Sequence, residues 1–136
     1  MIADSPELQE AFPEVDCGQQ PLGNRVIVQI RRVKKVSAGK IILVADTKET
    51  EKWNTTVAKL IKLGPLAFKN RNTAESWPEG AWVEVGDFVR VPRWGGDRWE
   101  VAIEGEEDPA LFVVFNDHEL ITKVTGDPLK IKAFIL

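Results

Sequence analysis

An all-β domain is the fold class that the sequence predicts. Short runs rich in Val, Ile, Phe and Trp recur along the chain, and Gly, Pro or Asn stands near their ends. That pattern is typical of strands joined by turns. No segment has the apolar spacing of a long amphipathic helix. Regularly spaced short strands favour a small sandwich or barrel, and closure of the sheet would remove its unpaired edges.

The first predicted strand covers residues 25–31. Val26, Val28 and Ile30 alternate with polar residues such as Gln29. Alternation with a period of two is typical of a strand that is buried on one face only. We therefore expect one face of this strand in the core and the other in solvent.

Further strands are predicted on the same grounds. Four β-rich runs end near turn-forming residues, at 57–63, 81–85, 88–91 and 99–103. Residues 111–115 (LFVVF) are apolar throughout, which is typical of a strand covered on both faces. Residues 92–99 (PRWGGDRW) carry Gly and Asp where a tight turn needs them, which favours a hairpin between the strands on either side.

Two long connections, residues 33–56 and 65–80, interrupt this pattern. Unstructured connections of that length are uncommon in a small domain unless they are functional or disordered. The first contains three consecutive bulky apolar residues, Ile41, Ile42 and Leu43, between a basic flank and a polar flank. Apolar side chains in a solvated loop indicate a binding role. A short buried strand is the alternative interpretation, and the local pattern alone leaves both open.

Composition narrows the possible classes of protein. The chain has 136 residues, of which 43% are hydrophobic, enough for one domain with a single core. Its net charge of −3 disfavours a nucleic-acid partner. The only cysteine, Cys17, cannot form an internal disulfide, which fits a reducing compartment, and we expect it in a loose N-terminal arm. No membrane span or secretory signal is visible, so we expect a cytoplasmic protein.

Several short motifs occur in an order that resembles the GroES-type co-chaperonins. That family begins with Pro-Leu-x-Asp-Arg-Val and continues with Ser-Ala-Gly-Gly-Ile-Val-Leu. This chain has PLGNRVIV at residues 21–28 and SAGKIIL at residues 37–43. Later landmarks follow in the same order, with VAKL at 57–60, LGP at 63–65, VGDFV at 85–89 and FNDHELI at 115–121.

The resemblance implies a domain organisation. Residues 21–125 would form a GroES-like small β-barrel, preceded by an acidic N-terminal arm at 1–20 and followed by a C-terminal tail at 126–136. Residues 33–56 correspond to the family's mobile loop, and residues 65–80 to the β-hairpin that forms the roof of a dome. Pro65, Leu66, Phe68, Trp77 and Pro78 lie in that roof segment, where we expect structural rather than binding roles.

A function follows from the same resemblance. In the family, a heptameric dome caps an ATP- or ADP-bound GroEL-type chaperonin and encloses a client protein for folding. Ile41, Ile42 and Leu43 stand where the family has the Ile-Val-Leu anchor that enters an apolar groove on the chaperonin. Chaperonin, client and further copies of this chain are the partners implied, with no membrane and no nucleic acid.

The loop turn departs from the family pattern at one position. Ser37, Ala38 and Gly39 match the small residues that form this turn, but Lys40 replaces the family's second glycine. A lysine side chain disfavours positive φ, so the turn differs in detail from that of the family.

Ring closure and the chain ends give further expectations. Family subunits pair their first strand with the last strand of the next subunit, which here corresponds to residues 22–28 and 120–124. In the tail, apolar residues including Leu129 and Ile131 alternate with Lys130 and Lys132, which predicts an added strand or packing against a neighbouring subunit. Such divergence would suit a virus-encoded member acting in the host cytoplasm.

A barrel that binds single-stranded nucleic acid is the first alternative. Cationic and aromatic residues are interleaved as in single-strand binders, at Arg90, Arg93, Trp94, Arg98 and Trp99. The acidic charge balance argues against a polyanionic partner. A hairpin turn explains the same residues.

An enzyme is the second alternative. GroES-like folds also occur in zinc-dependent alcohol dehydrogenases, but one Cys and one His cannot make the usual zinc site. His118 stands between Asp117 and Glu119, which is suggestive of acid–base chemistry, although a polar surface turn is the simpler interpretation. The acidic residues 104–108 lack the ligand spacing of an EF-hand. We therefore expect no enzymatic activity, no cofactor and no metal.

Overall fold

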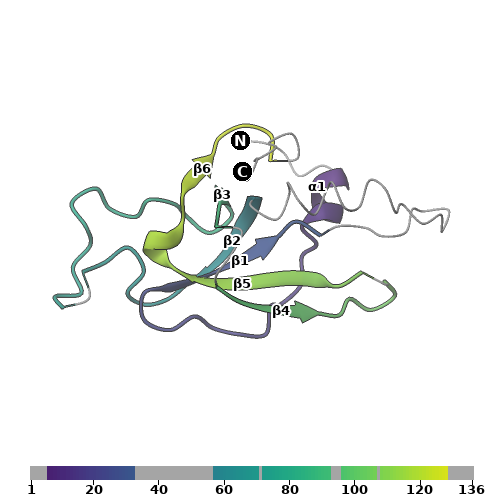
Figure 1. Cartoon of the computed structure of the whole chain (residues 1–136), viewed down its shortest axis with the longest axis horizontal. Helices are drawn as coiled ribbons and strands as arrows, with labels where there is room; N and C mark the ends of the chain where they lie inside the picture. Colours follow the sequence, from purple (N-terminus) through teal and green to yellow (C-terminus); the bar gives the residue numbers. More distant parts are fainter. Residues whose placement is uncertain (1–5, 33–56, 71, 93–95, 107, 129–136) are drawn as a thin grey trace.

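The computed structural model describes residues 6–32, 57–70, 72–92, 96–106 and 108–128. Its elements are a short helix α1 (Pro6–Ala11) and the strands β1 (Arg25–Ile30), β2 (Val57–Leu63), β3 (Phe88–Arg90), β4 (Asp97–Val101), β5 (Ala110–Asn116) and β6 (Thr122–Val124), with a 3-10 turn η1 (Asp117–Glu119) before β6. Strands dominate the described chain (Figure 1). The all-β prediction is confirmed.

All six strands belong to one antiparallel sheet, in the order β4-β5-β1-β2-β3-β6. The first strand, β1, is central: Val28 pairs with Leu60 of β2 on one side and with Val113 of β5 on the other. Strands β4 and β6 form the two edges. In Figure 1 the chain between β2 and β3 extends as a long loop to the left of the strands.

Alternate residues of β1 and β5 belong to two separate hydrophobic clusters. The first cluster takes from these strands Val26, Val28, Ile30, Val113 and Phe115. The second cluster contains Cys17, Ile27, Ala110 and Phe112. Because successive side chains of a strand point to opposite faces, the clusters lie on the two faces of the sheet. The prediction that residues 111–115 are covered on both sides is confirmed.

The expectation that β1 has one solvent face is wrong. All residues of β1 after Arg25 are buried, including Gln29, which is 2% exposed. The side-chain amide of Gln29 donates a hydrogen bond to the Pro13 carbonyl at 2.8 Å. The N-terminal arm therefore covers the face that we expected in water, and an arm carbonyl satisfies the one polar side chain there.

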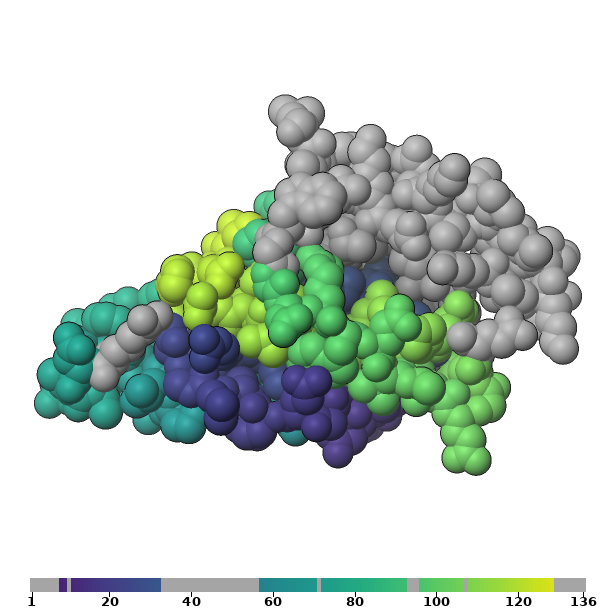
Figure 2. All heavy atoms as spheres, turned by 60° about the horizontal axis from the view of Figure 1, so that its bottom comes forward, coloured from purple at the N-terminus to yellow at the C-terminus, as the bar shows by residue number. Residues whose placement is uncertain are grey.

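The N-terminal arm is packed against the sheet, and the expectation of a loose arm around Cys17 is wrong. Helix α1 contributes to a third cluster of Leu8, Ala11 and Phe12, against which Phe88 of β3 packs. The rings of Phe12 and Phe88 meet edge to face with centroids 5.1 Å apart. Cys17 is only 2% exposed. In Figure 2 the purple N-terminal residues lie along the body of the molecule.

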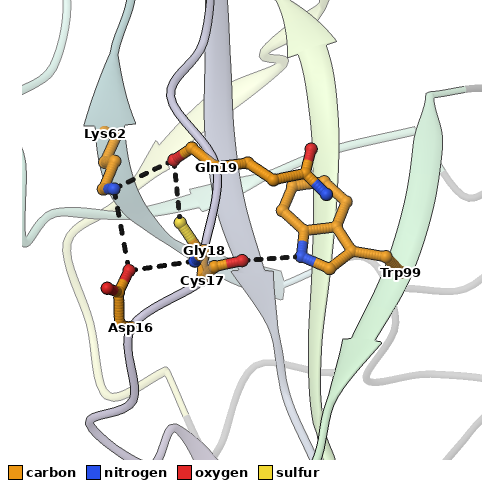
Figure 3. A network of polar contacts seen from close by, with 6 residues as sticks. All are labelled: Asp16, Cys17, Gly18, Gln19, Lys62 and Trp99. Carbon is orange, nitrogen blue, oxygen red and sulfur yellow. Dashed lines mark hydrogen bonds and ion pairs between the residues drawn. The ribbon is translucent and has the colours of Figure 1, made fainter.

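Beyond α1, polar contacts tie the arm to two strands (Figure 3). The indole Nε1 of Trp99, on β4, donates to the Cys17 carbonyl at 2.9 Å. The Nζ of Lys62, on β2, donates to the Gln19 carbonyl at 2.9 Å and lies 3.8 Å from an Asp16 carboxylate oxygen. The arm thus joins strands that are not neighbours in the sheet.

Residues 81–85 were expected to form a strand and do not. The chain turns there instead. The Asp87 amide donates to the Glu84 carbonyl at 3.0 Å, and the Asp87 carboxylate accepts a hydrogen bond from the Glu84 amide at 2.8 Å. These local bonds compete with strand pairing for the backbone. Val83 nevertheless belongs to the core, as its apolar character suggested.

The expected hairpin between the third and fourth strands is also wrong. Strand β3 pairs with β2 and β6, whereas β4 pairs with β5. Gly96 has a φ of +73°, and a Cβ there would lie 2.6 Å from Val113 Cγ1 and 2.8 Å from the Val114 carbonyl oxygen. Glycine is needed at this position because the backbone passes close to β5, not because β3 and β4 form a hairpin.

Candidate functional site

Strands β1 and β2 position both ends of the predicted binding segment, residues 33–56. The two strands are antiparallel neighbours, and Ile30 near one end pairs with Ala58 near the other. Ile30 and Val57 are each 1% exposed. The described residues on either side of the segment therefore belong to the same buried part of the sheet and lie side by side.

Arg32 is the last described residue before the segment, and it is held from three directions. Its backbone amide donates to the Ala11 carbonyl at 2.7 Å. Its guanidinium Nη1 lies 2.7 Å from a Glu106 carboxylate oxygen and donates to the Asp108 carbonyl at 3.2 Å. The Arg32 side chain is 3% exposed, whereas that of Glu106 is 39% exposed. We call Arg32, Glu106 and the carbonyls of Ala11 and Asp108 the root clamp.

Arg31 stands beside the root clamp in a half-buried position. Burial lowers the pKa of its guanidinium, and the charge of Asp127 opposes that effect. Asp127 and Pro128 begin the C-terminal tail, and Pro128 is buried. Asp127 in the tail therefore interacts electrostatically with Arg31, two residues before the predicted binding segment.

The residues predicted to contact a partner lie outside the described chain. They are the anchor residues Ile41, Ile42 and Leu43 and the turn residues Ser37, Ala38 and Gly39. Their roles stay predictions. The tail residues from Leu129 onward also lie outside the described residues, so the added strand stays a prediction as well.

The roof segment contains two core residues, Ala67 and Phe68, and one half-exposed indole, Trp77, with Trp82 just beyond it. Phe68 is 2% exposed, and its amide donates to the Asp117 carboxylate at 2.8 Å. The two arms of the segment meet at a single bridge between Lys69 and Ser76. Trp77 and Trp82 are 36% and 41% exposed. Phe68 thus has a structural role, as expected for this segment.

Trp99, one of the two aromatic residues on which the nucleic-acid interpretation depends, makes contacts within the domain. The Trp99 ring stacks on Phe112 with centroids 5.8 Å apart, and its indole nitrogen is bonded to the Cys17 carbonyl. Neither its stacked face nor its N–H is available to a base. Arg93 and Trp94 lie outside the described residues. The contacts of Trp99 do not favour the single-strand alternative.

The acidic residues near His118 have structural partners. The two Asp117 carboxylate oxygens accept hydrogen bonds from the Asn24 side chain at 3.3 Å and from the Phe68 amide at 2.8 Å. His118 lies 3.6 Å from Asp117 with its side chain 62% exposed. Within the described ranges, no three His, Cys, Asp or Glu side chains are grouped so that they could hold a metal ion. Asp117 anchors the roof segment to η1.

Sequence reasoning missed the root clamp. It placed Arg32 in a basic run without a structural role. The only signal in the sequence was that Arg32 stands two residues after Ile30, just beyond the end of β1. A buried arginine needs a charged or carbonyl partner. Neither the acidic loop nor the arm could be identified as that partner from sequence spacing.

Comparison with known proteins assigns this β-rich domain to a protein family. The family model described as "Chaperonin 10 Kd subunit" matches residues 19–124. The chain belongs to this chaperonin 10 family. The resemblance read from the short motifs, and the GroES-like all-β fold that it implied, are confirmed. Residues before 19 and after 124, which include α1, lie outside the match.

Two relatives show how far the similarity extends. The "10 kDa heat shock protein, mitochondrial" of Saccharomyces cerevisiae is 32% identical over 108 residues, covering 79% of this chain and 89% of the relative. The "Co-chaperonin GroES" of Syntrophomonas wolfei is 28% identical over 105 residues, covering 77% of this chain and 96% of the relative.

In the described part of this chain, no helix has the length and apolar composition of a membrane span.

Proposed function

We propose that this chain is the subunit of a heptameric co-chaperonin ring that caps a nucleotide-bound GroEL-type chaperonin and encloses a folding client. The family match carries the proposal, because it spans residues 19–124 and so includes both sides of the segment 33–56. The paired ends of β1 and β2 support it further, since the segment connects two neighbouring inner strands of the sheet. Its site of action would be the cytoplasm that contains the chaperonin, of the host cell if the chain is virus-encoded.

In this proposal Ile41, Ile42 and Leu43 enter an apolar groove on the chaperonin. A fully buried aliphatic side chain contributes about 1.5–3 kcal/mol, so three contribute roughly 5–9 kcal/mol in total. Ordering one residue of backbone costs about 1–2 kcal/mol, which offsets much of that gain for a single segment. One subunit alone should therefore bind weakly.

A ring changes this balance because every subunit presents the same segment. Once one segment is bound, the others bind at high effective concentration, and avidity raises the overall affinity by about 10² to 10⁴. Weak individual contacts then give a lid that binds firmly and still releases. Ser37, Ala38 and Gly39 form the turn of the segment in this scheme, because small residues leave its backbone unobstructed.

The expected pairing of residues 22–28 of one subunit with residues 120–124 of the next is wrong for residues 26–28, because these already pair with both β2 and β5 of their own chain. Ring closure through residues 120–124 would therefore be limited to residues 22–25 of the next subunit. Two features of the structure are consistent with this pairing. Strand β6 lies at an edge of the sheet. Leu22 and Ile121 are 68% and 54% exposed, and a neighbouring subunit in the ring would bury them. A closed ring would also cover the edge that β6 leaves open.

A triple substitution of Ile41, Ile42 and Leu43 to Ser tests the proposed anchor. Binding to a bacterial GroEL-type chaperonin with ATP or ADP would be measured by co-sedimentation. We expect the wild-type protein to bind and the variant to lose detectable binding, with its unfolding midpoint unchanged. The matched control replaces Thr47, Lys48 and Glu49 with Ser on the polar side of the same segment.

The outcomes separate the anchor from general effects of the segment. The control variant should bind as the wild type does, because its substitutions remove no apolar side chain. Equal binding by the wild type and the anchor variant would overturn the role of Ile41, Ile42 and Leu43. Equal loss in both variants would mean that the segment is recognised along its length and not through these three residues.

A further inference from the structure

The root clamp is an arrangement that the family match does not account for. Its Ala11 carbonyl belongs to helix α1, and the family model matches only from residue 19 onward. The clamp therefore joins the extra arm, the β4–β5 loop and the start of segment 33–56 at one residue. Arg32 is the residue at which all three meet.

We infer that Arg32 is a positioning residue for the chaperonin-binding segment, and that the N-terminal arm serves to hold it. The root clamp fixes the backbone and side chain of residue 32, the last described residue before the segment. It thereby sets how well the anchor residues are presented to the chaperonin. This inference rests on the proposed function.

The chemistry of the clamp argues for positioning more than for stability. Replacing a buried ion pair by well-packed apolar side chains often leaves stability unchanged or raises it. Arg32 is only 5% exposed just beyond the end of β1, so an aliphatic residue there would be buried without desolvating a charge. What arginine adds is direction, because a charge-assisted hydrogen bond at 2.7 Å is short and geometrically demanding.

A fixed root changes binding through conformational entropy. A segment whose ends are held in one geometry has fewer free conformations to lose when it docks. Loosening one end adds conformations to the unbound state and leaves the docked contacts unchanged. The effect is repeated in every subunit of the proposed ring, so a small loss per segment becomes a large loss of capping affinity.

The arm offers a matched control at a second ion pair. Lys62 also joins the arm to the sheet. Its Nζ donates a hydrogen bond to the Gln19 carbonyl and lies 3.8 Å from an Asp16 carboxylate oxygen. It lies five residues along β2 from Val57, which is about 16 Å at roughly 3.3 Å per residue. Removing its charge therefore loosens the arm without touching the root of the segment.

The test compares Arg32→Gln, Arg32→Lys and Lys62→Gln with the wild type. Three quantities are measured for each protein: ring mass, the affinity for a GroEL-type chaperonin with ATP, and amide hydrogen exchange in peptides that cover residues 30–32 and 57–58. We expect Arg32→Gln to keep its ring mass, to exchange faster in both peptides and to bind about tenfold more weakly or worse. Arg32→Lys should recover part of the affinity, and Lys62→Gln should bind as the wild type does.

Three other outcomes would overturn either the positioning role of Arg32 or the proposed function. Wild-type binding that persists in Arg32→Gln would overturn the positioning role while leaving the proposed function intact. If Lys62→Gln weakened chaperonin binding as much as Arg32→Gln, the arm would matter only through general stability. That result would also overturn the positioning role of Arg32. A wild-type ring that fails to bind the chaperonin would overturn the proposed function and this inference with it.

Discussion

Replacing Phe12 with Ala removes the side chain that joins the N-terminal arm to the sheet most directly. Phe12 is 4% exposed and lies in the small cluster with Leu8 and Ala11. Its ring meets Phe88 of β3 edge to face, with an interplanar angle of 66°. The substitution therefore tests whether the arm is part of the folded domain, although the family match begins after it.

The expected loss of stability follows from burial and from the ring contact. Replacement of a buried Phe by Ala costs about 3–5 kcal/mol in a well-packed core, and an edge-to-face pair accounts for about 0.5–1.5 kcal/mol beyond burial. The cluster around Phe12 is small, and one of its walls is the six-residue helix α1, which can shift to close part of the cavity. We therefore expect the free energy of unfolding to fall by about 3 kcal/mol, the lower end of that range.

Urea unfolding followed by tryptophan fluorescence measures this loss. The signal should respond because Trp99 contacts the arm through the Cys17 carbonyl. The comparison requires equal protein concentration, since the stability of an oligomer depends on concentration. Gln9→Ala is the matched control, because Gln9 is exposed on the same helix and its substitution should change stability by less than about 0.5 kcal/mol. A change below about 0.5 kcal/mol for Phe12→Ala as well would refute the packed arm.

Three further predictions follow from contacts in the described chain. Gln29→Met keeps the shape of a side chain that is 2% exposed but leaves the Pro13 carbonyl without its hydrogen-bond donor. The free energy of unfolding in urea should fall by about 1–3 kcal/mol, and an unchanged midpoint would contradict this. Gly64→Ala would bring a Cβ within 2.5 Å and 2.8 Å of two backbone oxygens, so we expect a loss of at least about 1–3 kcal/mol, and a neutral result would mean that this turn yields easily. The hydrogen bond from Trp82 lowers the pKa of Glu79 below its ordinary value of 4.5, so its stabilising effect is present above pH 4.5 and is lost as the pH falls through the lower, folded pKa. An indole fluorescence change in acid that is absent from Glu79→Gln would identify this titration, and its persistence in that variant would assign it elsewhere.

The strands that could be predicted are those whose pattern reflects their own burial. The wholly apolar run 111–115 indicated a strand covered on both faces, and β5 is such a strand. The alternation in residues 25–31 located β1 but gave its second face wrongly. That face is covered by the N-terminal arm, which is distant in the sequence, and a local pattern contains no information about such a partner.

Local turn signals were less informative for the same reason. Gly and Asp in residues 92–99 satisfy the requirements of a hairpin turn, but β4 pairs with β5 and Gly96 is needed for close approach to that strand. The root clamp depends on Glu106 and on a helix of six residues, which is too short for periodicity to identify. The order of short motifs was the stronger guide, because it depends on the whole domain and not on one turn.

Light scattering of the purified protein, alone and then with a GroEL-type chaperonin and ATP, decides whether this chain forms a ring that caps a chaperonin. We expect a ring of seven copies of 15.2 kDa, about 106 kDa, that adds its full mass to the chaperonin only when nucleotide is present. A monomer of 15.2 kDa that leaves the mass of the chaperonin unchanged would contradict the co-chaperonin account and leave only a GroES-like domain.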